Sequence, residues 1–88
     1  MNEGKLREEM DRGAKSAALL RNELLVEAFE TLETQYTESW KSSASHHADA
    51  RERIYMLTTA LAALRQHLIS VVETGRLAER QLTELNKK

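Results

Sequence analysis

The chain has 88 residues, no cysteine, no proline and a formal net charge of −1 at pH 7. This length leaves room for one small domain, and the lack of cysteine excludes a disulfide framework and a thiolate metal site. No stretch approaches the roughly 20 apolar residues of a membrane span, and no apolar signal-peptide core follows the first methionine. These two features predict a cytoplasmic protein. The abundance of Ala, Leu, Glu and Arg predicts an all-α fold, in a single domain over residues 1–88.

The first predicted helix covers residues 4–40 and shows helical spacing in two phases. The first phase consists of Leu6, Met10, Gly13, Ala17, Leu20 and Leu24, and the second, offset by one residue, consists of Leu25, Phe29, Leu32 and Tyr36. The change of phase falls at Asn22, which suits the N-cap of a new helix. Because no proline or glycine enforces a stop there, the sequence favours one continuous helix, bent or with a local stutter, over a break at Asn22.

A loop is predicted over residues 41–48, where small polar side chains compete with the helix for the local backbone. Asp49, followed three residues later by Glu52, resembles a capping box with Asp in place of Ser or Thr. The second predicted helix therefore runs from residue 50 to residue 86, a length of about 55 Å.

The second predicted helix carries an apolar repeat with alternating steps of three and four residues. Its members are Ile54, Leu57, Leu61, Leu64, Leu68, Val71, Gly75, Ala78, Leu82 and Leu85. A heptad repeat of this length predicts a helix whose apolar stripe, here called the seam, is covered by other helices. The phase continues unchanged across Gly75, which favours an uninterrupted helix with a close backbone approach over a helix end capped by that glycine.

These elements predict an antiparallel hairpin of two long helices with coiled-coil-like packing. The central packing is expected from Ile54, Leu57, Leu61, Leu64, Leu68 and Val71, faced by Phe29, Leu32, Tyr36 and Trp40. Trp40 is expected to close the end of the hairpin against Ile54 or Tyr55, or else to anchor a partner. Because apolar residues extend beyond the seam on both helices, we expect self-association or docking onto a protein partner.

Charge is distributed unevenly along the chain, with ten acidic and six basic residues in 1–50 and four acidic and seven basic residues in 51–88. This asymmetry indicates that an acidic helix and a basic helix lie side by side. Glu23, Glu27 and Glu30 share one helical face and form a candidate docking surface for a basic partner.

The sequence carries no recognisable catalytic or cofactor motif. It has no nucleophile elbow, no phosphate-binding glycine loop and no Glu-x-x-His pair of a helical di-metal site. His46 and His47 are adjacent, but His67 is the only other histidine, and a zinc site needs three or four converging ligands. The sequence therefore predicts a protein that is not an enzyme and that holds no cofactor or metal.

Several segments resemble small, uncharacterised helical proteins encoded by tailed bacteriophages and prophages. They are Asn22–Phe29, Trp40, Asp49–Tyr55 and Leu68–Ala78, and the likeness covers roughly residues 12–85. The resemblance implies a phage-encoded helical protein in the host cytoplasm, connected with the head or the packaging machinery. It assigns no activity to any residue.

A partial resemblance also links the chain to secreted WXG-type helical hairpins, which have a Trp at the turn between two helices. In Trp40-Lys41-Ser42, however, a serine stands where that motif has glycine. No tyrosine follows Tyr55 to form the export signal of that family, so export by that route is not expected.

The sequence thus predicts a non-enzymatic structural or adaptor protein that acts through protein–protein contacts, such as a phage assembly or packaging component. One alternative is a nucleic-acid-binding packaging or regulatory factor, with phosphate contacts from Arg76, Arg80, Lys87 and Lys88. Another is a phage-encoded inhibitor of a host protein that presents the acidic face from Glu23 to Glu38.

Overall fold

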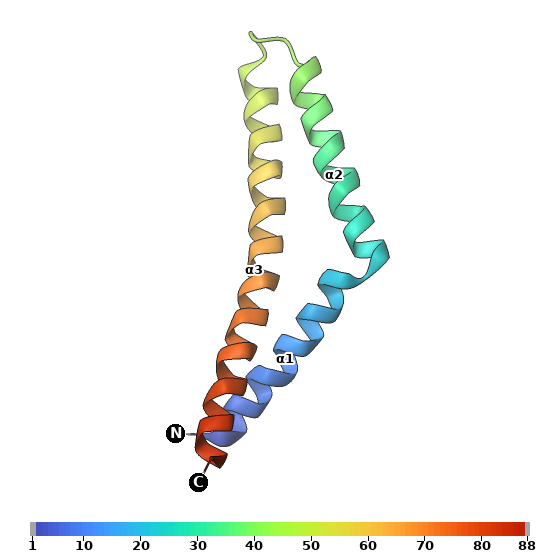
Figure 1. Cartoon of the computed structure of the whole chain (residues 1–88). Helices are drawn as coiled ribbons and strands as arrows, with labels where there is room; N and C mark the ends of the chain where they lie inside the picture. The colour runs from blue at the N-terminus through green and yellow to red at the C-terminus, as the bar shows by residue number, and fades with distance from the viewer. Residues whose placement is uncertain (1, 88) are drawn as a thin grey trace.

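The computed structural model describes residues 2–87 and contains three α-helices and no strand over that range (Figure 1). Helix α1 spans Glu3–Arg21, α2 spans Glu23–Ser42 and α3 spans Ala48–Asn86. Helix α3 runs back past both of the others, so the start of α1 and the end of α3 lie at the same end of the molecule. The all-α prediction is confirmed, and the molecule is slender, with extents of 65 × 25 × 15 Å.

Asn22 joins α1 to α2 and forms the elbow visible in Figure 1. Its N–H donates to the carbonyl oxygen of Leu19 at 3.0 Å, and its Oδ1 accepts from the N–H of Leu25 at 3.0 Å. The same residue therefore closes one helix and caps the next. The favoured continuous helix over residues 4–40 is wrong, because the asparagine side chain satisfies a backbone donor and stops the helix without any proline or glycine.

Residues 43–47 connect α2 to α3, a shorter loop than the predicted one over residues 41–48. Helix α3 begins at Ala48, and its N-cap residue, His47, makes no side-chain capping bond. The predicted capping box is wrong, because Asp49 already lies in the first helical turn and is too late in the chain to be the N-cap. Its negative charge still suits the N-terminus of the helix.

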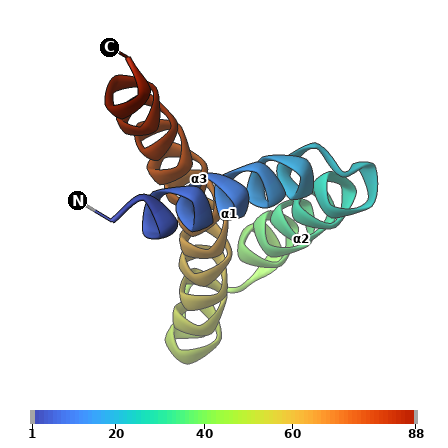
Figure 2. The same cartoon turned by 90° about the horizontal axis from the view of Figure 1, so that it is seen from below.

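Helix α1 crosses α3 (Figure 2), and Gly13 and Gly75 face each other where the two backbones come closest. A Cβ atom built on either glycine would lie 2.8 Å from the Cα atom of the other, so the two backbones are in contact. Nearby, the buried hydroxyl of Ser16 donates to the carbonyl oxygen of Leu68 at 2.7 Å. Helix α3 continues through Gly75, which confirms both the uninterrupted helix and the close approach expected there.

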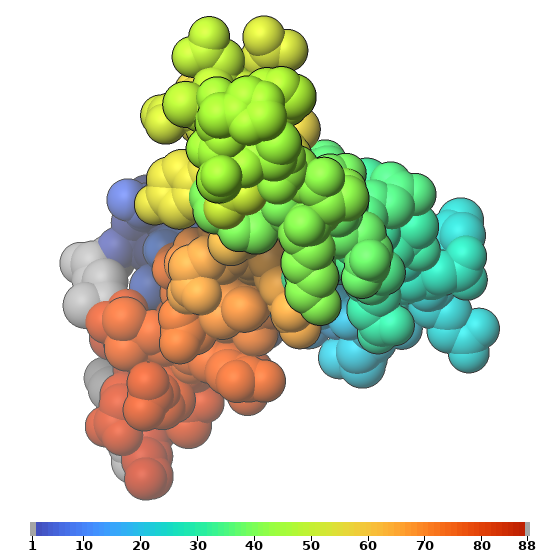
Figure 3. Space-filling view, turned by 90° about the horizontal axis from the view of Figure 1, so that it is seen from above, coloured from blue at the N-terminus to red at the C-terminus, as the bar shows by residue number. Residues whose placement is uncertain are grey.

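The core is small and is divided between two places. Leu6 of α1 packs with Ala78 and Leu82 of α3 near the chain ends, and Phe29 of α2 is buried separately. Seen from the loop end, the molecule spreads apart, with the elbow at one side and the C-terminal part of α3 at another (Figure 3). The first arm of the expected hairpin is therefore two helices that pack against α3 in different ways.

Candidate protein–protein interface

The C-terminal half of the seam is covered by α1 as far as Leu82, beyond which Leu85 is 40% exposed. Gly75, Ala78 and Leu82 are buried there, while Leu68 and Val71 are half-buried. The small side chains at the crossing are what allow this cover, because two helices approach so closely only where no side chain separates them. Within one chain, the packing of α1 against this half of α3 is the main contact between helices far apart in sequence.

The N-terminal half of the seam is only partly covered, because α2 approaches α3 at one edge of the seam, at Ile54, and not over Leu57 and Leu64. Near the loop, α2 lies against Ile54, Tyr55 and Thr58. Successive residues of an α-helix are about 100° apart, which places this line roughly 100° around α3 from Leu57 and Leu64. These two leucines are 49% and 54% exposed, so they do not carry central packing within one chain.

Leu57, Ala60 and Leu64 form one continuous strip on α3, which we call the bare row. All three side chains are exposed, and Met56 lies beside them with 60% of its surface exposed. The other two expected seam residues in this half, Ile54 and Leu61, are half-buried. The sequence identified both leucines of the bare row as members of a seam that carries central packing and through which copies associate.

The residues of α2 that were expected to face the seam meet α3 to different degrees. Phe29 is buried, Leu32 and Tyr36 are half-buried, and Trp40 is 39% exposed. Trp40 lines the same shallow pocket as Ile54 and Tyr55, the two residues against which it was expected to close the hairpin. The partial exposure of the indole leaves open its alternative role as an anchor for a partner.

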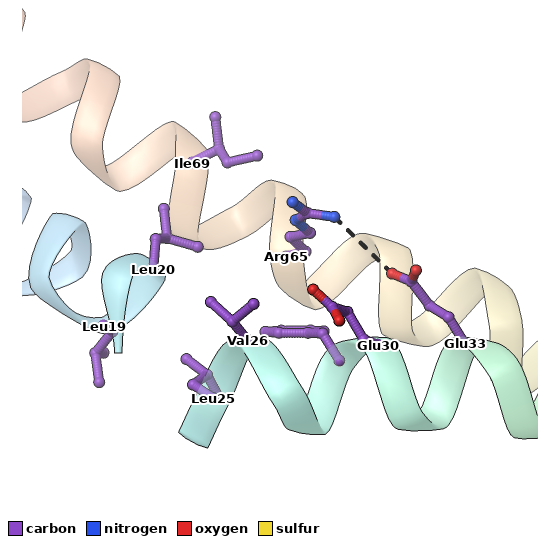
Figure 4. Close-up of a pocket in the computed structure, with 9 residues that line it drawn as sticks. Leu19, Leu20, Leu25, Val26, Glu30, Glu33, Arg65 and Ile69 are labelled. Atoms are coloured by element: carbon purple, nitrogen blue, oxygen red, sulfur yellow. Dashed lines mark ion pairs between the residues drawn. The ribbon is translucent and has the colours of Figure 1, made fainter. Parts of the chain in front are cut away.

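A groove of about 180 Å³ lies at the elbow, between α2 and the middle of α3 (Figure 4). We call this cavity the elbow groove. Its apolar lining residues are Leu19, Leu20, Leu25, Val26, Phe29 and Ile69. An ion pair bridges the two helices at one end, with Arg65 Nη1 3.9 Å from Glu33 Oε1. The pair is largely solvent-exposed and therefore contributes little to stability.

Arg51 is a structural residue that the sequence did not reveal. Its guanidinium carbon lies 3.9 Å from the centre of a Trp40 ring, and its Nη1 donates to Ser43 Oγ at 2.8 Å. The same nitrogen also reaches the carbonyl oxygen of Ser43 at 3.3 Å. A cation at this place complements the C-terminal end of α2, where unpaired carbonyl groups gather. Arg51 therefore fastens the loop end of α3 to the end of α2.

The residues of the expected acidic face are all exposed on α2, and one of them, Glu30, lies at the edge of the elbow groove. Glu23, Glu27 and Glu30 are exposed, and none of them forms an ion pair within residues 2–87. Glu33, on the same helix, is the acidic residue that reaches α3. The acidic face is therefore available to a second molecule.

The histidines of the loop lie against each other. The ring centres of His46 and His47 are 4.3 Å apart, in an edge-to-face arrangement. Across residues 2–87, no cluster of three or more His, Cys, Asp or Glu residues has the geometry to hold a metal ion. In the same part of the chain, no helix has both the length and the apolar character required to cross a bilayer.

Comparisons with known proteins give no relative for this chain: no family model, no curated protein and no solved structure matches it. The candidate interaction surfaces therefore follow from the structure of this chain alone. They are the bare row of α3, the acidic face of α2, the elbow groove and the pocket beside Trp40.

Proposed function

We propose that this chain is a non-enzymatic structural or adaptor protein that works through protein–protein contacts and associates with copies of itself. The observation that carries the proposal is the amount of surface that one chain leaves exposed. A single chain has a solvent-accessible surface of 6973 Å², whereas a compact monomer of its mass exposes about 5,300 Å². The excess of about 1,700 Å² is roughly twice the surface that each partner buries in a standard interface.

The thin core supports the same proposal. Within residues 2–87 no large side chain is completely buried, and Leu57, Leu64 and Tyr55 are about half exposed or more. A small domain that buries so little apolar surface gains little free energy from folding alone. Association supplies the missing burial, because it removes apolar surface from water on both partners.

The net charge of −1 also favours association between copies, since chains that are nearly neutral repel one another only weakly. The resemblance to small helical proteins of tailed phages extends the proposal to an assembly or packaging component. In that setting the protein repeats one contact many times, which requires a surface for copies of itself more than a catalytic centre.

The test is the mass of the protein in solution, measured by light scattering after gel filtration over a range of concentrations. The proposal expects a dimer of about 20 kDa, twice the 10.1 kDa of one chain, or a larger closed assembly. A stable 10 kDa particle at about 500 μM, far above the dissociation constants of specific assemblies, would contradict self-association.

A further inference from the structure

The bare row has the geometry of half of a helix–helix interface. Leu57 and Leu64 are seven residues apart on an uninterrupted helix, with the small Ala60 between them. Leucines at this spacing with a small residue between them let the side chains of a second helix insert and its backbone approach. Helix α1 packs on the same seam further along, where the small residues Gly75 and Ala78 permit a close approach.

The charges around the bare row are opposite in sign to those of α2. From residue 53 to residue 72, the chain has two arginines and one histidine but no acidic residue. From residue 22 to residue 40, which includes most of α2, it has five glutamates and no basic residue. In a single chain only the pair of Glu33 with Arg65 links the two stretches, as seen in residues 2–87. The remaining glutamates of α2 and Arg53 are free to pair with another molecule.

A second copy of the same chain offers both an apolar surface for the bare row and opposite charges for the basic stretch of α3. It brings an identical bare row for the apolar contact and an acidic α2 for the basic stretch of α3. In a two-fold arrangement each complementary contact occurs twice, so a short row of residues yields a large interface. The excess of exposed surface is sufficient for an interface of the size that stable dimers bury.

We infer that the bare row of α3 is the contact surface between two copies of this chain, with the acidic face of α2 from one copy beside the basic stretch of α3 from the other. This inference rests on the proposed self-association and specifies where it takes place. It assigns an intermolecular role to Leu57 and Leu64.

A pair of single-cysteine variants tests the location directly, because the chain has no cysteine of its own. Leu57→Cys places the thiol on the bare row, while Leu77→Cys places it on the far side of the same helix. The two leucines are matched in exposure, at 49% and 48%. With a short bismaleimide crosslinker, we expect several times more crosslinked dimer from Leu57→Cys. Equal yields, or a larger yield from Leu77→Cys, would overturn the inference.

A second pair of variants tests the energetics of the contact. Leu57→Glu combined with Leu64→Glu buries two charges in the inferred interface, and the expected result is a helical monomer by circular dichroism and light scattering. The control combines Leu24→Glu with Leu77→Glu, two exposed positions away from the bare row, and is expected to keep the mass of the wild type. If the first variant loses its helical signal, the crosslinking result decides.

The outcomes separate the inference from the proposed function. A wild-type oligomer that tolerates both glutamates on the bare row would disprove this interface and leave self-association standing. A wild-type monomer throughout the concentration range would disprove both.

Discussion

The hydroxyl of Ser16 in α1 donates a hydrogen bond of 2.7 Å to the carbonyl oxygen of Leu68 in α3. Leu68 lies about one turn from Leu64, the nearer leucine of the bare row. The bond therefore lies at the boundary between the half of the seam that α1 covers and the half that it leaves exposed. It is a specific polar contact between α1 and α3 at this boundary.

Loss of this bond should lower stability measurably. Ser16→Ala removes a buried donor, and we expect a loss of about 1 kcal/mol in the free energy of unfolding. The measurement is urea unfolding followed by circular dichroism, at one fixed protein concentration. The control is Ser70→Ala, whose exposed hydroxyl bonds only to His67 of its own helix and should change stability by less than about 0.5 kcal/mol. Equal losses in the two variants would contradict the assigned role.

The crossing of α1 and α3 should be too tight to accommodate even one additional methyl group. Gly75→Ala normally stabilises a helix interior by about 1 kcal/mol, but here the new Cβ meets the Cα of Gly13 at 2.8 Å. We expect a net destabilisation of about 1–3 kcal/mol, because the helices must move apart. The reverse exchange at an exposed site of the same helix, Ala63→Gly, reports the local preference for alanine. A more stable Gly75→Ala variant would show that the crossing is not tight.

The elbow should depend on the side chain of Asn22. Asn22→Ala removes the bond to the N–H of Leu25, and the expected cost is about 1 kcal/mol. Asn22→Asp keeps an acceptor at this position and should stay within about 0.5 kcal/mol of the wild type. Small-angle scattering provides a second readout, since α1 and α2 of the alanine variant should straighten toward one helix. An unchanged profile and unchanged stability would show that tertiary contacts alone hold the elbow.

The contact of Arg51 with Trp40 can be followed by fluorescence, because Trp40 is the only tryptophan. Arg51→Met removes both the cation above the ring and the bonds to Ser43, so we expect an altered emission spectrum. The expected loss of stability is about 1 kcal/mol. Arg80→Met, an exposed position of the same helix outside the bare row, is the control for the loss of one positive charge. If both variants shift the emission equally, the indole does not sense Arg51 specifically.

Much of the fold could be predicted from local pattern. The heptad repeat identified nearly the whole of α3 and, in its C-terminal half, the face that packs against α1, and its constant phase predicted the uninterrupted helix at Gly75. The polar stretch around Ser43 located the loop to within a few residues. These features depend on residues close together in the chain, where helical periodicity is a reliable signal.

The direction of the first arm could not be predicted in the same way. The phase change at Asn22 marked the place, but whether the chain bends or stops there depends on a side-chain bond and on how α1 packs against α3. The same limit applies to the bare row. A heptad pattern shows that Leu57 and Leu64 share a face with Gly75, but not that α2 approaches α3 only at one edge of that face. Arg51 was missed because its partners lie across a loop.

The facing glycines have a further consequence for how this chain can change by mutation. In most helix contacts, a larger residue on one side is accommodated by a smaller residue on the other. Gly13 and Gly75 leave no such compensation, since neither can be replaced by anything smaller. A selection for second-site suppressors of Gly75→Ala should therefore recover changes elsewhere in α1 or α3 and none at Gly13. Any substitution at Gly13 or Gly75 can therefore only increase the distance between α1 and α3.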